Sequence, residues 1–193
     1  GSETGDAVAD VLFGKITPSG KLTTTFPRSV GQLPLFYNHL NTGRPDPDSR
    51  MFNRYASNYL DESNEPLYPF GYGLSYTDFV YGELQISSET LPKNGELTVS
   101  VTVTNKGNYD GYETVQLYLR DIYAEVARPM KELKGFERIF LKSGESRDVK
   151  FVITKDDLKF YNSELHYVYE PGEFDVMVGP NSRDVQTKSF QAE

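Results

Sequence analysis

The residues best placed to do chemistry surround Ser75, in a stretch that resembles the turn carrying the nucleophilic serine of α/β-hydrolases. That turn needs a glycine two residues before the serine and another two residues after it. Gly73 fills the first place, but Thr77 stands in the second. A general base would have to come from His39 or His166, the only histidines in the chain. The pattern is incomplete, so Ser75 is interpreted as a small residue of an extended segment, and no catalytic residue is predicted.

Sites for phosphate, metal ions and glycoside hydrolysis are equally weak in this sequence. Residues 14–21, GKITPSGK, have five residues between their glycines where a phosphate-binding loop has four, so nucleotide binding is not predicted. Four acidic residues could bind calcium, but they lack the ordered spacing of a calcium loop and are interpreted as solvated surface: Asp46, Asp48, Asp61 and Glu62. Hydrolysis of glycosides requires two opposed carboxylates, and none of the 28 acidic residues stands out as half of such a pair. No cofactor and no metal site is predicted.

One segment places a large side chain at every second position. Within LYPFGYGLSYTDF, residues 67–79, the large side chains are Tyr68, Phe70, Tyr72, Leu74 and Tyr76. An extended backbone sends alternate side chains to opposite faces, so one face would be aromatic and the other almost bare. Three interpretations are open: packing between domains, packing within a sandwich, or a platform for a sugar ring. We favour inter-domain packing by these five residues, because sugar platforms commonly use indole rings and the chain has no tryptophan.

The first part of the chain predicts a helix and then a strap. Residues 2–13 predict a short helix whose apolar stripe includes Val8, Val11 and Leu12. A lone helix cannot bury such a stripe by itself, so this one is expected to dock through those three residues. Residues 17–76 contain seven prolines and no sustained period, yet they are rich in tyrosine and phenylalanine. This composition favours an ordered strap laid over other surfaces rather than a disordered linker.

From about residue 78 the pattern changes to β-strands. Apolar and polar residues alternate in four runs, at residues 97–104, 115–119, 149–153 and 174–178. Turn residues separate the runs, and Thr154 with Asp157 predicts one capped helical turn. About seven short strands over this length are typical of a two-sheet, immunoglobulin-like antiparallel β-sandwich. The chain is therefore predicted to be mainly β.

Composition excludes several classes of partner. The formal charge of −8 repels phosphate backbones and anionic lipid head groups, so no nucleic acid partner is expected. No apolar run approaches the roughly 18 residues needed to cross a bilayer, so membrane insertion is not expected either. The chain has no cysteine, which excludes disulfides and thiolate metal sites. Its first residues lack the charged and apolar regions of a signal peptide.

Three stretches resemble the C-terminal end of glycoside hydrolase family 3, in particular its periplasmic β-glucosidase-like members. They are GSETGDAVADVLFGKITPSGKLTTTFPRSVGQLP (residues 1–34), EPLYPFGYGLSYTDF (residues 65–79) and RPMKELKGFERIFLKSGESRDV (residues 128–149). YNHLNTGRP, residues 37–45, also fits, so the resemblance covers nearly the whole chain in the family's order. One departure is Thr23, since members often have proline after the Gly-Lys-Leu of residues 20–22.

The resemblance implies a three-domain parent enzyme, with a barrel, then an α/β sandwich domain, then a fibronectin type III-like domain. Residues 1–30 would be the C-terminal remnant of the α/β domain, residues 31–77 an inter-domain strap, and residues 78–193 the fibronectin type III-like β-sandwich. Members are retaining exo-enzymes, and their nucleophilic aspartate and acid/base glutamate both lie before the part represented here. No catalytic residue is therefore carried over. The resemblance also implies a periplasmic or secreted location.

The leading hypothesis is a non-catalytic structural fragment of a β-glucosidase that braces the upstream catalytic domains of the same polypeptide. A β-glucoside or oligosaccharide would be the substrate of the parent only, and a homodimer is a further option. One alternative is a carbohydrate-binding module that uses tyrosines expected to be exposed: Tyr109, Tyr112, Tyr118 and Tyr123. The other alternative is an immunoglobulin-like domain that binds protein, although such a domain would have no use for the helix and the strap.

Overall fold

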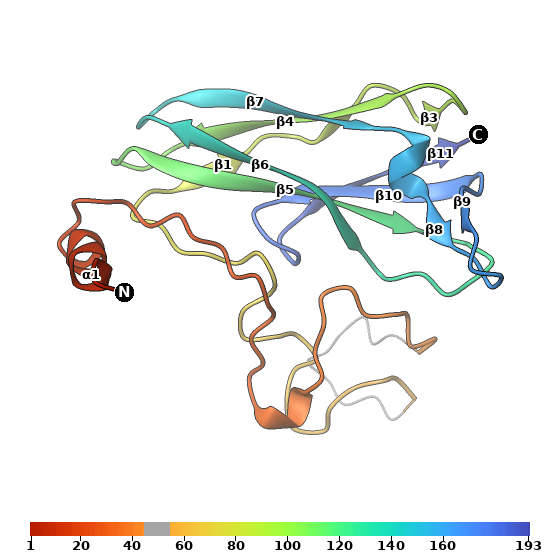
Figure 1. Ribbon diagram of the computed structural model, residues 1–193, viewed down its shortest axis with the longest axis horizontal. Helices are drawn as coiled ribbons and strands as arrows, with labels where there is room; N and C mark the ends of the chain where they lie inside the picture. The colour runs from red at the N-terminus through yellow and green to blue at the C-terminus, as the bar shows by residue number, and fades with distance from the viewer. Residues whose placement is uncertain (45–54) are drawn as a thin grey trace.

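The computed structural model describes residues 1–44 and 55–193, and it shows a β-sandwich with one helix and a long irregular segment outside it (Figure 1). The mainly β class and the sandwich predicted from the sequence are confirmed. The sandwich contains more strands than the sequence indicates, because several strands have only two or three residues and are too short to produce a pattern.

One sheet is built around β4 (Leu97–Asn105). Its antiparallel neighbours are β1 (Phe79–Tyr81), β2 (Gln85–Ile86) and β7 (Ser146–Ile153). The residues of β4 alternate between buried and more exposed positions, as its alternation of valine with serine and threonine predicts.

The other sheet has five strands in the order β3-β11-β10-β5-β6. Its strands are β3 (Thr90–Leu91), β11 (Gln186–Ala192), β10 (Gly172–Gly179), β5 (Gly111–Asp121) and β6 (Glu132–Leu141). All pairs are antiparallel except the short β3–β11 pair. A register shift between Leu117 and Tyr118 of β5 interrupts its ladder with β6. Because β6 pairs only with β5, it is an edge strand of this sheet.

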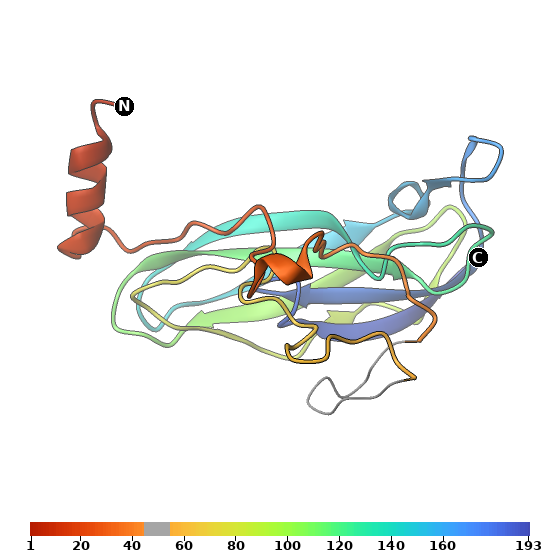
Figure 2. The same ribbon diagram turned by 90° about the horizontal axis from the view of Figure 1, so that it is seen from below.

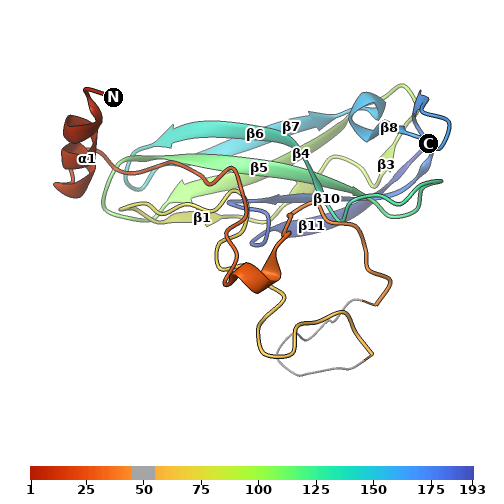
Figure 3. The same ribbon diagram turned by 60° about the horizontal axis from the view of Figure 1, so that its bottom comes forward.

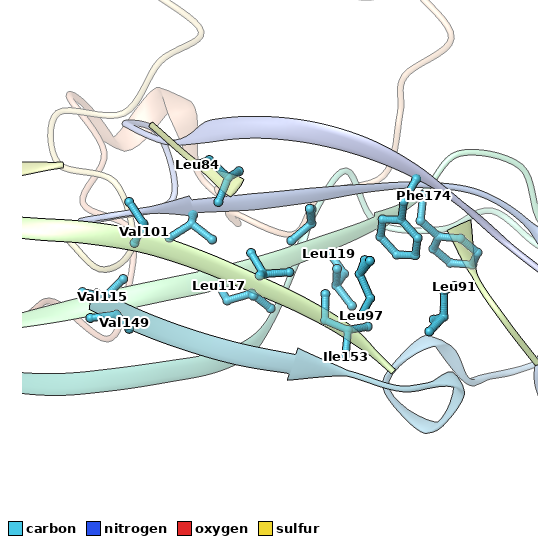
Figure 4. Close-up of a cluster of buried hydrophobic side chains, with 14 of the residues drawn as sticks. Leu84, Leu91, Leu97, Val101, Val115, Leu117, Leu119, Val149, Ile153 and Phe174 are labelled. Carbon is cyan, nitrogen blue, oxygen red and sulfur yellow. The ribbon is translucent and has the colours of Figure 1, made fainter. Parts of the chain in front are cut away.

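The core lies between the inner faces of the two sheets (Figure 4). It is made of aliphatic side chains and two stacked phenylalanines, and it includes Leu97, Val101, Val115, Leu117, Leu119, Val149, Ile153, Phe174 and Phe190. Burying one such side chain contributes about 1.5–3 kcal/mol, so this cluster accounts for most of the apolar stabilisation of the sandwich.

A capped helical turn leads from the core to a small hairpin. Thr154 caps η2 (Lys155–Leu158) with Asp157 in a capping box, which confirms the sequence prediction. The hairpin that follows consists of β8 (Phe160–Tyr161) and β9 (Tyr167–Val168).

The helix predicted at the start of the chain is α1 (Thr4–Leu12), and it stands away from the sandwich (Figure 2). None of its residues is buried. Val8 is 51% exposed and Leu12 is 72% exposed, so the expected docking does not take place on this chain itself. Within residues 1–44 and 55–193, no helix is long and apolar enough to cross a bilayer.

The irregular segment is ordered where the structure describes it. It contains η1 (Val30–Gln32), and Gln32 is buried. The Gln32 amide donates to the carbonyl oxygens of Ser63 (2.8 Å) and Glu65 (3.3 Å), which ties two distant parts of the segment together. The strap is therefore ordered where the structure describes it. Phe36 is 61% exposed and Leu60 is 78% exposed, so the expected covering of other surfaces stays a prediction, and Phe52 lies outside the described residues.

A carboxylate at the end of β5 is shielded from solvent. Both oxygens of Asp121 are buried. Burial raises the pKa of Asp121 to about 6, although the Arg128 guanidinium partly opposes this shift. Because an aspartate in an unfolded chain has a pKa of about 3.9, the folded state binds this proton more tightly.

Asp121 is therefore expected to reduce the free energy of unfolding as pH rises from about 4 to about 6. Asp121→Asn should raise the melting temperature relative to the unaltered chain at pH 7, and the difference should shrink at pH 4. Thermal unfolding at both pH values measures this, with exposed Asp6→Asn as the control. An Asp121→Asn advantage that is equal at the two pH values would contradict the prediction.

Candidate docking surface

Two distant segments of the chain pair on the outside of the sandwich, and together we call them the ribbon: residues 20–26 and 67–74 (Figure 3). The Leu22 amide donates to the Tyr72 carbonyl at 2.8 Å, and the Gly71 amide donates to the Leu22 carbonyl at 2.8 Å. The Phe26 amide donates to the Tyr68 carbonyl, also at 2.8 Å. These bonds fix residues 67–72, which carry most of the predicted aromatic pattern, against residues 22–26.

The bare face of the ribbon lies on the sandwich. Pro69 and Gly71 are buried. The Gln116 amide on β5 donates to the Gly71 carbonyl at 3.1 Å and to the Pro180 carbonyl at 2.7 Å. A Cβ on Gly71 would lie only 2.7 Å from Gln116 Cδ, so glycine is what permits this close approach.

A turn interrupts the predicted alternation. Gly71 has φ +79, and the Tyr72 amide donates to the Pro69 carbonyl at 3.2 Å. This turn separates Phe70 from the other large side chains, so Phe70 stacks on Tyr37 with ring centroids 4.3 Å apart. Tyr37 in turn meets the edge of Tyr118 on β5. Burial, followed by the nearby Tyr37, raises the pKa of Tyr118 well above its usual value, so Tyr118 stays neutral in this cluster.

The aromatic face of the ribbon points outward and forms a groove of about 500 Å³. The groove is lined mainly by apolar side chains: Leu22, Phe26, Tyr68, Tyr72 and Leu74, with Lys21 and two glycines. Tyr68 and Tyr72 stack at 5.0 Å, and Phe26 meets Tyr68 edge-on at 6.4 Å. Leu74 is nevertheless 70% exposed. The rings are therefore ordered, but an apolar surface stays uncovered, which is typical of a docking site.

The last large residue of the pattern contacts the helix. The Tyr76 hydroxyl donates to the Val11 carbonyl of α1 at 2.8 Å. Phe13, just after α1, is 89% exposed. A second uncovered apolar surface therefore lies at the end of α1.

Comparison with known proteins assigns this arrangement to a family. A family model described as the glycosyl hydrolase family 3 C-terminal domain matches residues 1–76, and one described as the fibronectin type III-like domain matches residues 113–182. A periplasmic β-glucosidase of Salmonella typhimurium is 52% identical over 191 residues, which cover 99% of this chain and 25% of that protein. The chain belongs to glycoside hydrolase family 3. It corresponds to a C-terminal portion of the family 3 proteins that it matches.

Other family 3 proteins agree in sequence and in structure. A putative β-xylosidase of Formosa agariphila is 45% identical, with 98% of this chain and 24% of that protein covered. The crystal structure of a β-glucosidase from Listeria innocua in complex with glucose superposes with a TM-score of 0.89 at 45% identity, over 97% of this chain and 26% of that chain. This chain thus spans about a quarter of the length of these relatives.

The structure brings together some of the five residues predicted to pack between domains. Tyr68, Tyr72 and Leu74 share the groove, whereas Phe70 faces Tyr37 and Tyr76 reaches α1. The sequence interpretation missed two groove residues, Leu22 and Phe26. Their even spacing is compatible with an extended segment, but two apolar residues are too few to establish a period.

Two other predicted sites have separate outcomes. Tyr118 was expected to be exposed as part of a carbohydrate-binding surface, and this is wrong, because it is fully buried under Tyr37 and its hydroxyl donates to Gln116. Of the acidic residues considered for calcium, Asp46 and Asp48 lie outside the described residues. Among the described ones no group of metal-binding side chains is present, and Glu62 accepts a hydrogen bond from Ser29.

Proposed function

We propose that this chain is the C-terminal part of a β-glucosidase-like enzyme and that it acts as a brace for catalytic domains encoded upstream. The parent would remove terminal β-linked glucose or related sugars, and this portion would contribute no catalytic residue. The observation that carries the proposal is the orientation of the ribbon. Pro69 and Gly71 face the sandwich, and the large residues of the ribbon other than Phe70 face away from it. The ribbon is thus anchored on one side and unpartnered on the other.

The size and chemistry of the uncovered surface fit a protein partner. A groove of about 500 Å³ lined by leucine and aromatic rings accepts several apolar side chains. Relatives are about four times as long as this chain, so the same polypeptide supplies a large partner at high effective concentration. The exposed stripe of α1 adds apolar surface to be covered by that partner.

The proposal places domain boundaries as the resemblance implies. Residues 1–30 would belong to the α/β domain, residues 31–77 would form the strap, and residues 78–193 would form the brace. A periplasmic or secreted location is proposed with it, since the Salmonella relative is named as periplasmic. A homodimer and direct contact with a β-glucoside stay predictions from the resemblance.

Turnover of an aryl β-glucoside tests whether catalysis depends on the upstream domains and not on this chain. The purified 193-residue chain should show no hydrolysis above buffer, whereas the parent polypeptide should hydrolyse the substrate. Specific turnover by the isolated chain that one carboxylate-to-amide substitution abolishes would overturn the brace. A parent polypeptide inactive on both β-glucosides and β-xylosides would overturn the proposed enzyme.

A further inference from the structure

A largely buried ion pair joins the ribbon to the sandwich. Lys21 Nζ lies 3.0 Å from Glu113 Oε1 and 3.1 Å from Oε2, across a separation of 92 residues. The two side chains are 17% and 6% exposed, which makes this pair the most buried of the ion pairs formed by the described residues. Such a pair holds its partners at a defined position, because both carboxylate oxygens face the same ammonium group.

Neighbouring groups fix the geometry of the pair. The Tyr81 hydroxyl of β1 donates to Glu113 Oε1 at 2.8 Å. Burial, and then the negative charge of Glu113, raise the pKa of Tyr81 far above its usual value, so Tyr81 remains a neutral donor. A Cβ on Gly73 would clash with the Gly20 carbonyl oxygen and would also lie 2.9 Å from Lys21 Cδ, so glycine lets residues 20 and 21 approach the opposite segment of the ribbon closely.

The pair also determines where the preceding segment lies. α1 has no buried residue, and one hydrogen bond holds it directly, from the Tyr76 hydroxyl to the Val11 carbonyl. Its place relative to the sandwich therefore depends largely on the contacts made by the residues that follow it. Besides the ion pair, these contacts are the Arg138–Ser19 hydrogen bond at 3.1 Å and the backbone bond of Leu22 to Tyr72. Of the three, the ion pair is the strongest constraint on a side chain.

Stability alone does not account for such a pair. Desolvation of two charges offsets most of their attraction, and a well-packed apolar pair often stabilises a protein equally well. What an apolar pair lacks is directional geometry. The pair is thus compatible with a role in position rather than in stability.

We propose that Lys21 and Glu113 are positioning residues, which set the place of residues 1–22, the start of the match to the family 3 C-terminal domain, relative to the sandwich. Through α1 they would set the place of the upstream domain on which α1 docks. The inference rests on the proposed function, since only a brace has catalytic domains to position. A misplacement of about 1 Å far from the reacting groups can lower turnover by roughly a hundredfold.

A double apolar replacement separates position from stability. In a Tyr81→Phe parent polypeptide, where no hydroxyl is left without its acceptor, Lys21→Met combined with Glu113→Leu should leave the unfolding midpoint close to that of Tyr81→Phe alone. It should lower kcat for an aryl β-glucoside at least tenfold, with a smaller change in KM. The matched control is Arg128→Met with Glu132→Leu, another partly buried pair, which does not contact residues 1–26 and should leave kcat unchanged. Unchanged kcat in the Lys21/Glu113 variant would overturn the proposal.

A second measurement does not depend on enzyme activity or on the double variant. In the 193-residue chain, Glu113→Gln should accelerate amide hydrogen exchange at Leu22 and Gly71 at least tenfold, while exchange in β10 stays unchanged. Equal exchange rates at Leu22 and Gly71 in the unaltered chain and in the Glu113→Gln variant would overturn the positioning role. If the unaltered parent polypeptide is inactive but Glu113→Gln accelerates exchange in the 193-residue chain, the proposed enzyme activity is refuted. The role of the ion pair in holding residues 20–26 then still stands.

Discussion

Gly71→Ala is expected to destabilise the chain by about 2–5 kcal/mol, because the new methyl group meets two obstacles at once. The first is the backbone, since φ +79 disfavours any residue with a Cβ. The second is Gln116, whose Cδ would lie 2.7 Å from the new Cβ. Gln116 cannot swing away at little cost, because it bonds Gly71, Pro180 and Tyr118 in a buried site. Urea unfolding should show this loss in the free energy of unfolding. Thermal unfolding should show a melting temperature lower by roughly 5–20 °C.

Gly144→Ala is the matched control for this substitution. Gly144 has the same φ of +79, but a Cβ there would meet nothing within 4 Å. Its loss should be only about 1–2 kcal/mol, which is the backbone cost alone. If Gly71→Ala costs no more than Gly144→Ala, the close contact with Gln116 does not hold the ribbon in place.

Leu74→Asp is expected to have little effect on the stability of the 193-residue chain and to destabilise the parent polypeptide. In the 193-residue chain Leu74 is 70% exposed, so the substitution should change the free energy of unfolding by no more than about 0.5 kcal/mol. In the parent, a covered groove would bury an unpaired carboxylate, and this should cost roughly 3–5 kcal/mol. Thermal unfolding and limited proteolysis of both proteins measure the difference.

Leu165→Asp provides the control for an exposed leucine elsewhere. Leu165 is 79% exposed in the β8–β9 hairpin, away from the groove. Leu165→Asp should have the same small effect in both proteins, neutral or slightly stabilising, because Leu165 has φ +63, which aspartate adopts more readily than leucine. Equal and small effects of Leu74→Asp in the fragment and in the parent would show that the upstream domains do not cover the groove.

The sandwich was predictable because its longest strands alternate plainly. In β4 the valines at every second position are buried and the intervening residues are more exposed, so pattern and burial coincide. β6 gives no such pattern. Its Ile139 faces the core, while Phe136 and Phe140 lie on the opposite side of the strand and are partly exposed. Apolar residues on both faces cancel the period of two.

The docking surface was only half predictable. The alternating large residues correctly indicated one bare and one aromatic face, but a turn at Gly71 redirects Phe70, and a single glycine cannot reveal its φ in advance. The Lys21–Glu113 pair could not be predicted, because charged residues 92 positions apart carry no local signal. The contact depends on the tertiary fold, which places residue 21 of the ribbon next to residue 113 of β5.

The orientation of the ribbon has a consequence for building chimaeric enzymes. Its inward residues pack against this sandwich, since Pro69 is buried and Gly71 meets Gln116 with no room for a Cβ. Under the proposed function, its outward rings would pack against the catalytic domains encoded upstream. Transplanting this C-terminal portion onto the catalytic half of another family member would therefore leave the inward positions untouched and require the outward ones to be redesigned for the new neighbour.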